Sequence, residues 1–239
     1  MLTTLYVEAR KLKGSLVLWL CLAAPTLVAV LLSVIFFRVR VASWTDNLTG
    51  ATGLWAYFVM PMTITALTIL VAQVEHGPRA WDHLLALPVP RWRLFAAKGI
   101  VVMTLIALMS ALLAVEIRLA GFMVEHVAPN RTPTGPFSWL LLIKLLSAMW
   151  GAALFMAMIQ LWVALRFRSF VAPLTVGIAG AFFAVAAFGA PETVFVPWVM
   201  PVSVIAGDHV RHMIAVTLGV GGGILTLIAM MISLSRREA

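Results

Sequence analysis

The chain has 239 residues, of which 63% are hydrophobic and 11% are charged, and its formal net charge is +8. A soluble globular domain is about half apolar and about one quarter charged, so this composition excludes an ordinary soluble domain and indicates a multispan membrane protein. Basic residues in such proteins collect at the cytoplasmic ends of spans and meet anionic lipid, so we expect membrane lipid as a partner and no nucleic acid.

The first predicted element is an amphipathic helix over residues 1–14. Apolar residues recur there at helical spacing, and charged residues occupy the rest of the circumference. The apolar positions are Leu2, Leu5, Tyr6, Ala9 and Leu12, and the charged positions are Glu8, Arg10, Lys11 and Lys13. A basic helix of this kind lies along the cytoplasmic surface of a membrane. A positive anchor for the following span is the alternative that the pattern leaves open.

Six apolar stretches follow, and each is predicted to be one membrane-spanning helix. About 20 apolar residues cross the hydrocarbon core as a helix, and a helix satisfies its own backbone polar groups in lipid. The predicted spans are 15–37, 54–74, 99–123, 139–165, 171–189 and 213–234. The sequence therefore predicts an all-α, polytopic fold, with one transmembrane domain that covers residues 1–239.

The distribution of lysine and arginine predicts which side of the membrane each loop faces. Of the 17 Lys and Arg residues, eleven fall on the side of the two termini, four fall on the opposite side, and Arg118 and Lys144 fall within spans. Short basic loops stay in the cytoplasm, so both termini are expected there. The expected location is a bacterial inner membrane.

The polar segment 75–98, between the second and third predicted spans, is the main functional candidate. A Gly-Pro pair interrupts the chain as it leaves the second span, and a short helix is predicted over 79–87. Pro88 and Pro90 end this helix, because the residue before a proline is displaced from the α region. Its apolar edge consists of Trp81, Leu84 and Leu85. Such a helix is suited to a groove in another protein, although a simple interfacial hairpin is the alternative.

Two stretches of the chain also carry a recognisable pattern. The first is Glu8-Ala-Arg-Lys11-Leu-Lys13-x-Ser15, and the second is Glu75-x-Gly77…Leu84-Leu85-x-Leu87-Pro88-Val89-x-Arg91…Phe95-x-x-Lys98. Together they resemble the ABC-2 type transporter permeases, and most closely the small six-span permeases of lantibiotic and bacteriocin immunity or antibiotic export. Pro78 is a departure, because members often have a small hydroxyl residue there, and it bears on where the short helix begins.

The resemblance implies a transport subunit that works with a separate motor. Permeases of this family pair as homodimers or related heterodimers, and each dimer recruits two cytoplasmic ATPase subunits, which bind ATP and magnesium. The segment between spans two and three then acts as a coupling helix, and the residues expected to couple are Glu75, Trp81, Leu84, Leu85, Pro88 and Arg91. No cofactor is expected on this chain itself. The glycine-rich stretch 219–223 lacks the Gly-Lys-Ser/Thr ending of a phosphate-binding loop, so we expect it to serve close helix packing.

The segment 189–212 is mostly apolar but contains several prolines. We expect two short helices that enter the outer leaflet partway, with their irregular backbone shielded by protein. A loop along the membrane interface is the alternative. The residues expected to form this outer gate are Pro197, Trp198 and Pro201.

Three ionisable residues fall within the predicted spans, namely Glu116, Arg118 and Lys144. Residues two apart do not share a helix face, so Glu116 and Arg118 are not expected to pair. Glu116 and Lys144 lie at similar depth on antiparallel spans and are expected to face each other inside the bundle. Extension of the Arg118 and Lys144 side chains to the interface is the alternative.

Together, the patterns and the resemblance predict the permease subunit of an ATP-driven ABC exporter. Its substrate is expected to be amphipathic, either a peptide antibiotic or a lipid-like molecule, moved by alternating access. The alternative is an ATP-independent carrier or an assembly scaffold, although a carrier should have two related halves with broken helices. The sequence holds no catalytic or metal-binding motif, so we expect neither an enzyme active site nor a metal.

Overall fold

The computed structural model describes residues 1–38, 43–76, 90–187, 190–206 and 208–236. Nearly all of this part of the chain is helical, and its one strand-like pairing is an isolated bridge between Ser43 and Thr134. The prediction of an all-α fold is therefore confirmed.

The first two helices follow the sequence prediction closely. Helix α1 covers Leu2–Lys11, and α2 covers Leu16–Arg38. The turn between them includes Gly14 at φ 78°, a backbone conformation that residues with a side chain rarely adopt. The 23 residues of α2 measure about 35 Å as a helix, which is enough to cross a bilayer.

The second span begins about ten residues before its predicted start. Helix α3 covers Trp44–Leu54, a π-helical turn covers Trp55–Val59, and α4 covers Met60–His76. Ser43 caps α3, since its hydroxyl accepts a hydrogen bond from the backbone N–H of Asp46 at 3.1 Å. The first turns of α3 are polar, and for this reason hydrophobicity alone placed the boundary too late.

Helices α6 and α7 form the long centre of the bundle. Helix α6 covers Arg91–Val127, with 37 residues, and α7 covers Trp139–Arg166, with 28 residues. A short 3-10 turn at Pro129–Arg131 lies in the connection between them. Because the helix already begins at Arg91, α6 is longer than the predicted span 99–123.

The number of long spans differs from the prediction. Five helical stretches in the described chain are long and apolar enough to cross a membrane, the last of them α10, His209–Ser235. The predicted span 171–189 corresponds to α8, Val171–Ala186, which has only 16 residues. Its length of about 24 Å is less than a hydrocarbon core of about 30 Å. Length alone therefore supports five crossings, and the count of six is not confirmed.

The segment before α10 contains two short helices. A 3-10 helix covers Pro191–Phe195, and α9 covers Met200–Ala206. Helix α9 packs against α7 and α10, and Val199 and Met200 are buried. The expectation of two short helical pieces is met, while their entry into a membrane stays a prediction.

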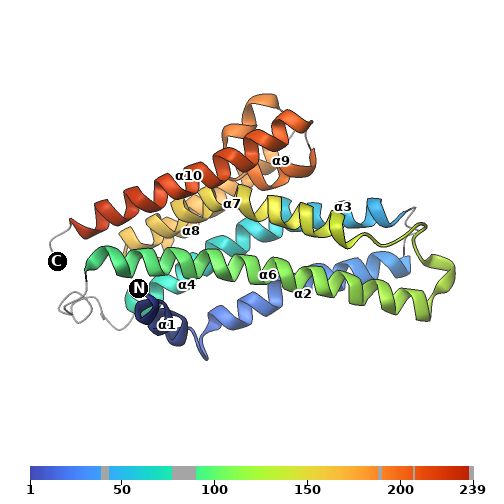
Figure 1. Ribbon diagram of the computed structural model, residues 1–239, viewed down its shortest axis with the longest axis horizontal. Helices are drawn as coiled ribbons and strands as arrows, with labels where there is room; N and C mark the ends of the chain where they lie inside the picture. The colour runs from blue at the N-terminus through green and yellow to red at the C-terminus, as the bar shows by residue number, and fades with distance from the viewer. Residues whose placement is uncertain (39–42, 77–89, 188–189, 207, 237–239) are drawn as a thin grey trace.

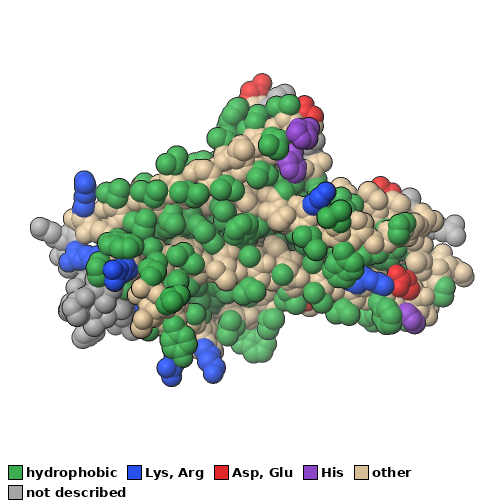
Figure 2. Space-filling view, in the orientation of Figure 1, with side chains coloured by type: hydrophobic (Ala, Val, Ile, Leu, Met, Phe, Trp, Pro, Cys, Tyr) green, Lys and Arg blue, Asp and Glu red, His purple; other side chains and the backbone are tan. Residues whose placement is uncertain are grey.

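The helices lie side by side in an elongated bundle, and both termini lie at the same end (Figure 1). Helix α6 runs along most of the bundle and packs against α2, and α10 packs against α7. Hydrophobic side chains cover the length of the face in Figure 2, where more of the visible lysine and arginine side chains lie on the half with the two termini than on the other half. This distribution suits a bundle whose long sides contact lipid.

The interface between α7 and α10 depends on glycine. A Cβ atom placed on Gly219 would lie 2.4 Å from Cα of Ala152, and one placed on Gly223 would lie 2.9 Å from Cβ of Leu154. Both glycines are buried. Such approaches leave no room for a side chain, so the glycine-rich stretch allows close helix packing, as expected.

We predict that Gly219→Val destabilises the protein by about 1–3 kcal/mol or more, because the new side chain meets backbone rather than a flexible side chain. A Cβ at Gly221 on the same helix would meet nothing within 4 Å, so Gly221→Val is the matched control. Thermal unfolding of both variants in detergent, followed by circular dichroism, checks the prediction. Equal melting temperatures would show that the close approach does not limit stability.

Candidate functional site

Four charged side chains meet where α1 lies against the ends of α4 and α6. They are Glu8, Lys11, Glu75 and Lys98, and we call them the charge ring. The Lys98 ammonium donates to Glu8 Oε2 at 2.6 Å and to Glu75 Oε1 at 2.7 Å. The Lys11 ammonium donates to Glu8 Oε1 at 2.6 Å and to Glu75 Oε1 at 3.0 Å. Carboxylates and ammonium groups therefore alternate around a closed circuit.

The secondary structure brings these residues together from three helices. Glu8 and Lys11 are three residues apart on α1, so they share one helix face. Glu75 is the next-to-last residue of α4, and Lys98 lies two turns into α6. The segment 77–89 connects these two helices. The charge ring thus ties α1 to both ends of the segment that was predicted to hold a coupling helix.

Three of the four members of the charge ring, Glu8, Glu75 and Lys98, are almost completely shielded from solvent. Lys98 is 2% exposed and Glu75 is 1% exposed, whereas the Lys11 side chain is 25% exposed. A buried charge is stable only when it is paired and hydrogen-bonded, and removal of one partner leaves the other charge uncompensated. Two carboxylates and two ammonium groups make the ring neutral as a whole. Its members therefore depend on one another.

The pairing keeps the α1 members of the ring ionised. Burial alone would raise the pKa of the Glu8 carboxyl, but the ammonium groups of Lys98 and Lys11 outweigh it and lower the pKa from 4.5. Burial alone would lower the pKa of the Lys11 ammonium, but the carboxylates of Glu8 and Glu75 outweigh it and raise the pKa from 10.5. Both groups are therefore charged throughout the neutral range.

The ring also fixes which face of α1 meets the bundle. Glu8 and Leu12 are buried, whereas Leu2 is 83% exposed and Tyr6 is also exposed. The predicted apolar stripe is thus divided: Leu12 contacts the bundle, and Leu2 and Tyr6 point away from it. An outward apolar face beside basic residues suits a helix that lies at a membrane surface.

The residues predicted to couple fall into two groups. Glu75 is a buried member of the ring, and Arg91 begins α6. Trp81, Leu84, Leu85 and Pro88 lie outside the described residues, so their contact with a partner stays a prediction. Sequence analysis did not select Lys98, Glu8 or Lys11 as site residues. The sequence did contain a signal: Glu75 directly follows the predicted span 54–74, and Lys98 directly precedes the predicted span 99–123. A charge next to an apolar run requires a partner.

The intramembrane charges have partners other than the predicted ones. Glu116 Oε1 and the Thr26 hydroxyl of α2 form a hydrogen bond at 2.6 Å. Arg118 forms an ion pair with Glu125 at 3.2 Å. Lys144 is exposed, and within the described chain no ion pair joins it to Glu116. The predicted pairing of Glu116 with Lys144 does not form, because Glu116 lies on the α6 face that packs against α2.

The predicted outer-gate residues lie in the segment between α8 and α10. Pro197 and Trp198 are half-buried, and Pro201 is buried in the first turn of α9. A Cβ on Gly180 of α8 would lie 2.4 Å from the Trp198 ring. Trp198 is therefore seated against a glycine, which holds the segment on the bundle. A gating role for these residues stays a prediction.

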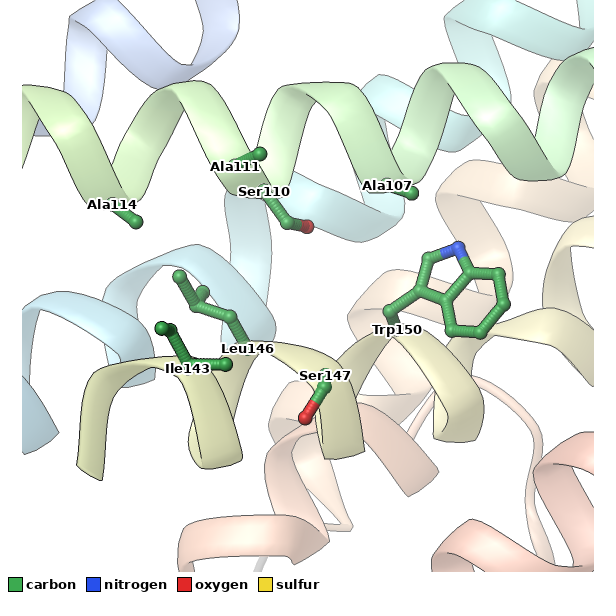
Figure 3. A pocket seen from close by; sticks show the side chains of 8 residues that line it. All are labelled: Ala107, Ser110, Ala111, Ala114, Ile143, Leu146, Ser147 and Trp150. Carbon is green, nitrogen blue, oxygen red and sulfur yellow. The ribbon is translucent and has the colours of Figure 1, made fainter. Parts of the chain in front are cut away.

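An apolar groove of about 230 Å³ separates α6 and α7 halfway along the bundle (Figure 3). Its lining consists of Ala107, Ser110, Ala111, Ala114, Ile143, Leu146, Ser147 and Trp150. The hydroxyls of Ser110 and Ser147 each donate to a carbonyl of their own helix, at 3.0 and 3.1 Å. The Trp150 indole donates to the Met103 carbonyl at 3.0 Å and closes one end. The groove therefore offers contact area rather than polar recognition.

Among the described residues, no group of three His, Cys, Asp or Glu side chains could hold a metal ion.

The fold and the charge ring together define a class of protein, namely a multi-pass helical membrane protein whose N-terminal helix is fastened to both ends of an interhelical segment. The sequence model of the ABC-2 family transporter proteins matches residues 4–185, which run from α1 into α8. The chain belongs to this family and is a membrane component of transport. No curated protein sequence matches the chain.

We predict that Lys98→Met destabilises the fold by about 3–5 kcal/mol, because two buried carboxylates lose a shared partner. Hydrogen exchange of residues 2–11 should rise severalfold as α1 detaches. Lys13→Met, on the exposed side just after α1, is the control and should leave both readouts unchanged. Unaltered exchange in Lys98→Met would show that the ring does not hold α1.

We also predict a defined pH window for the docking of α1. The lowered pKa of Glu8 means that its contribution is complete above its ordinary value of 4.5 and is lost as the pH falls through the lowered value. The raised pKa of Lys11 means that its contribution is complete below 10.5 and is lost as the pH rises through the raised value. Limited proteolysis within residues 1–14 across this range checks the prediction. Cleavage that is fastest near neutral pH would contradict it.

Proposed function

We propose that this chain is the permease subunit of an ATP-driven ABC exporter, and that the charge ring transmits the movement of a partner ATPase. The observation that supports this proposal is the position of the ring. One ammonium, that of Lys98, holds the end of α4 and the start of α6 together and binds both to α1. A force applied to segment 77–89 therefore acts on three helices at once.

The proposed assembly contains two permease chains, identical or related, and two cytoplasmic ATPase subunits that bind ATP and magnesium. Trp81, Leu84, Leu85 and Pro88 of the connecting segment would contact the ATPase, with Arg91 at its far end. Glu75 would act from inside the permease, because its carboxylate is buried and bound by two lysines. In this arrangement Glu75 positions the coupling segment rather than touching the motor.

The proposed topology has six crossings, with both termini in the cytoplasm of a bacterial cell. Both termini lie at one end of the bundle (Figure 1), and this placement supports an even number of crossings. Helix α8 would supply the sixth crossing despite its 16 residues, since a short helix is accommodated by local thinning of the bilayer. The excess of lysine and arginine near that end supports the cytoplasmic assignment.

Movement at the charge ring can reach the far end of the bundle through α6. The helix has 37 residues and a length of about 55 Å. It packs against α2 along one side and against α7 along the other, where the groove of Figure 3 leaves free space. A tilt of α6 would change the width of that groove. We propose that this tilt, paired across two chains, gives alternating access to an amphipathic substrate, with the segment around Trp198 as the outer gate.

We predict that the permease copurifies with a separate ABC ATPase and that two substitutions separate docking from transmission. Leu84→Asp/Leu85→Asp should abolish the complex, because two carboxylates replace the apolar contact edge. Lys11→Met should preserve the complex but lower the ATPase turnover of the reconstituted assembly severalfold, because α1 is loosened while the partly exposed site tolerates the loss. Copurification and phosphate release measure the two effects.

Lys13→Met is the matched control for Lys11→Met and should retain wild-type turnover. If the chain were an ATP-independent carrier or scaffold, the purified assembly would contain no ATPase subunit and would release no phosphate from ATP. This result would overturn the proposed function. A complex that survives the double aspartate variant with full turnover would exclude the docking role of the segment.

A further inference from the structure

Glu116 lies at the contact between α2 and α6, beside apolar side chains that point outward. Its Oε1 atom is 2.6 Å from the hydroxyl oxygen of Thr26, which is near the midpoint of α2. Thr26 is exposed, and so are Leu22 and Leu119, which share helix faces with Thr26 and Glu116 respectively. A carboxyl group therefore lies at a seam that faces lipid, far from either end of α2.

The Thr26 hydroxyl has more close neighbours than it has protons. Its oxygen is 2.8 Å from the Leu22 carbonyl oxygen and 2.6 Å from Glu116 Oε1. A hydroxyl donates one proton and accepts through two lone pairs, whereas a backbone carbonyl only accepts. If Thr26 donates to Leu22, its contact with Glu116 is favourable only when Glu116 supplies a proton of its own.

Other hydroxyls on the helices show where the Thr26 proton goes. Ser33, Thr104 and Thr217 each donate to the carbonyl four residues earlier, at 2.7–2.8 Å. Thr26 has the same spacing to Leu22, at 2.8 Å. A hydroxyl that faces lipid finds its nearest acceptor in this carbonyl, because no water is available there. The Thr26 proton is therefore used within α2.

The second oxygen of Glu116 agrees with a neutral carboxyl. Glu116 Oε2 is buried and has no hydrogen-bond donor among the described residues. An ionised carboxylate spreads its charge over both oxygens, and a buried anionic oxygen without a donor is strongly unfavourable. In a neutral acid with the proton on Oε1, Oε2 is the carbonyl oxygen of an uncharged group, and its need for a donor is smaller.

The cations on α6 and α7 do not compensate a charge on Glu116. Arg118 is two residues further along α6, on another face, and forms an ion pair with Glu125 at 3.2 Å. Lys144 of α7 is exposed, and among the described residues no ion pair joins it to Glu116. The last charged residue of α7 is in its final turn. An ionised Glu116 would therefore be an uncompensated charge at a lipid-facing seam, which is rare in membrane proteins.

The remaining elements that pack against α6 have their ionisable groups elsewhere. On α2, Cys21 has a thiol and no positive charge, and Arg38 is twelve residues from Thr26, about 18 Å along the helix. Arg131 of the 3-10 turn binds the backbone at the same end of α2 as Arg38. The ionisable groups of α4 and α10 lie in terminal turns. Those of α1 lie by the charge ring, where Lys98 is 18 residues before Glu116, about 27 Å along α6.

We propose that Glu116 is a proton-binding site, in which a neutral carboxylic acid joins α6 to α2. The Oε1–H group donates to the Thr26 hydroxyl oxygen, and the Thr26 hydroxyl donates to the Leu22 carbonyl. The two hydrogen bonds run in one direction, from α6 to the backbone of α2, and place no charge in the bilayer. The proton and the contact between the helices stabilise each other to the same extent, because linkage is reciprocal.

Infrared spectroscopy of the full-length permease in lipid vesicles at neutral pH tests this assignment. The C=O stretch of a protonated carboxyl absorbs at a higher frequency than the stretches of a carboxylate, so the two forms are measured separately. Glu116→Gln should remove one protonated carboxyl per chain and leave the carboxylate absorption unchanged. Glu125→Gln is the matched control on the same helix, because Glu125 forms an ion pair with Arg118, and it should remove carboxylate absorption only.

Two substitutions of Thr26 test the direction of the hydrogen bond. Thr26→Val keeps the shape of the side chain but removes the acceptor, so the acid C=O stretch of Glu116 should remain and shift to higher frequency. Thr26→Ser keeps the hydroxyl and should retain the wild-type band. Both positions are at an exposed site, and circular dichroism confirms that each variant is folded.

Two outcomes overturn the proposal. If Glu116→Gln loses carboxylate absorption while the protonated band stays intact, Glu116 is ionised and the Thr26 hydroxyl is its donor. If the protonated band keeps its wild-type frequency in Thr26→Val, the acid does not donate to Thr26, and the link between the proton and the contact of the two helices is absent.

Discussion

The contact between the Lys98 ammonium and two carboxylates is the constraint on which the rest of the structure depends. Charges cannot remain alone in a low-dielectric interior, so Glu8 and Glu75 must both reach the same ammonium. This requirement brings together the N-terminal helix, the end of α4 and the start of α6, which are up to 90 residues apart in sequence. Apolar packing has no such directional demand, because many arrangements bury similar areas.

The direction of these contacts has a mechanical consequence. Hydrophobic helices can slide past one another at small cost, whereas separation of a buried ion pair exposes uncompensated charge. The charge ring therefore resists the separation of α1, α4 and α6. Free space is present beside the ring, between α1, α2 and α6, and also between α6 and α7 and between α2 and α3. A directional contact next to loosely packed helix pairs lets the helices tilt while their ends stay joined.

Sequence predicted those features that depend on local pattern. Helices α1, α2, α7 and α10 were found because their apolar residues are long continuous runs or recur at helical spacing. The start of α3 was missed because Asp46 and Asn47 reduce the local hydrophobicity, although tertiary packing buries Asn47. The partner of Glu116 was wrong because depth alone does not determine which face of α6 meets α2 or α7. The charge ring was missed because pairing across three helices leaves no periodic signal.

The two ends of the bundle satisfy their polar groups in different ways. In the charge ring, each charge has an opposite charge within the same chain, although the second oxygen of the Glu75 carboxylate has no donor among the described residues. At the far end, the Asn47 oxygen has no donor among the described residues, and Arg38 lies exposed on the facing helix. Buried oxygens without a donor thus occur at both ends of the described bundle. The two ends differ instead in the ammonium groups, because Lys98 and Lys11 join three helices at one end and no comparable ion pair joins α2 to α3 in the described chain.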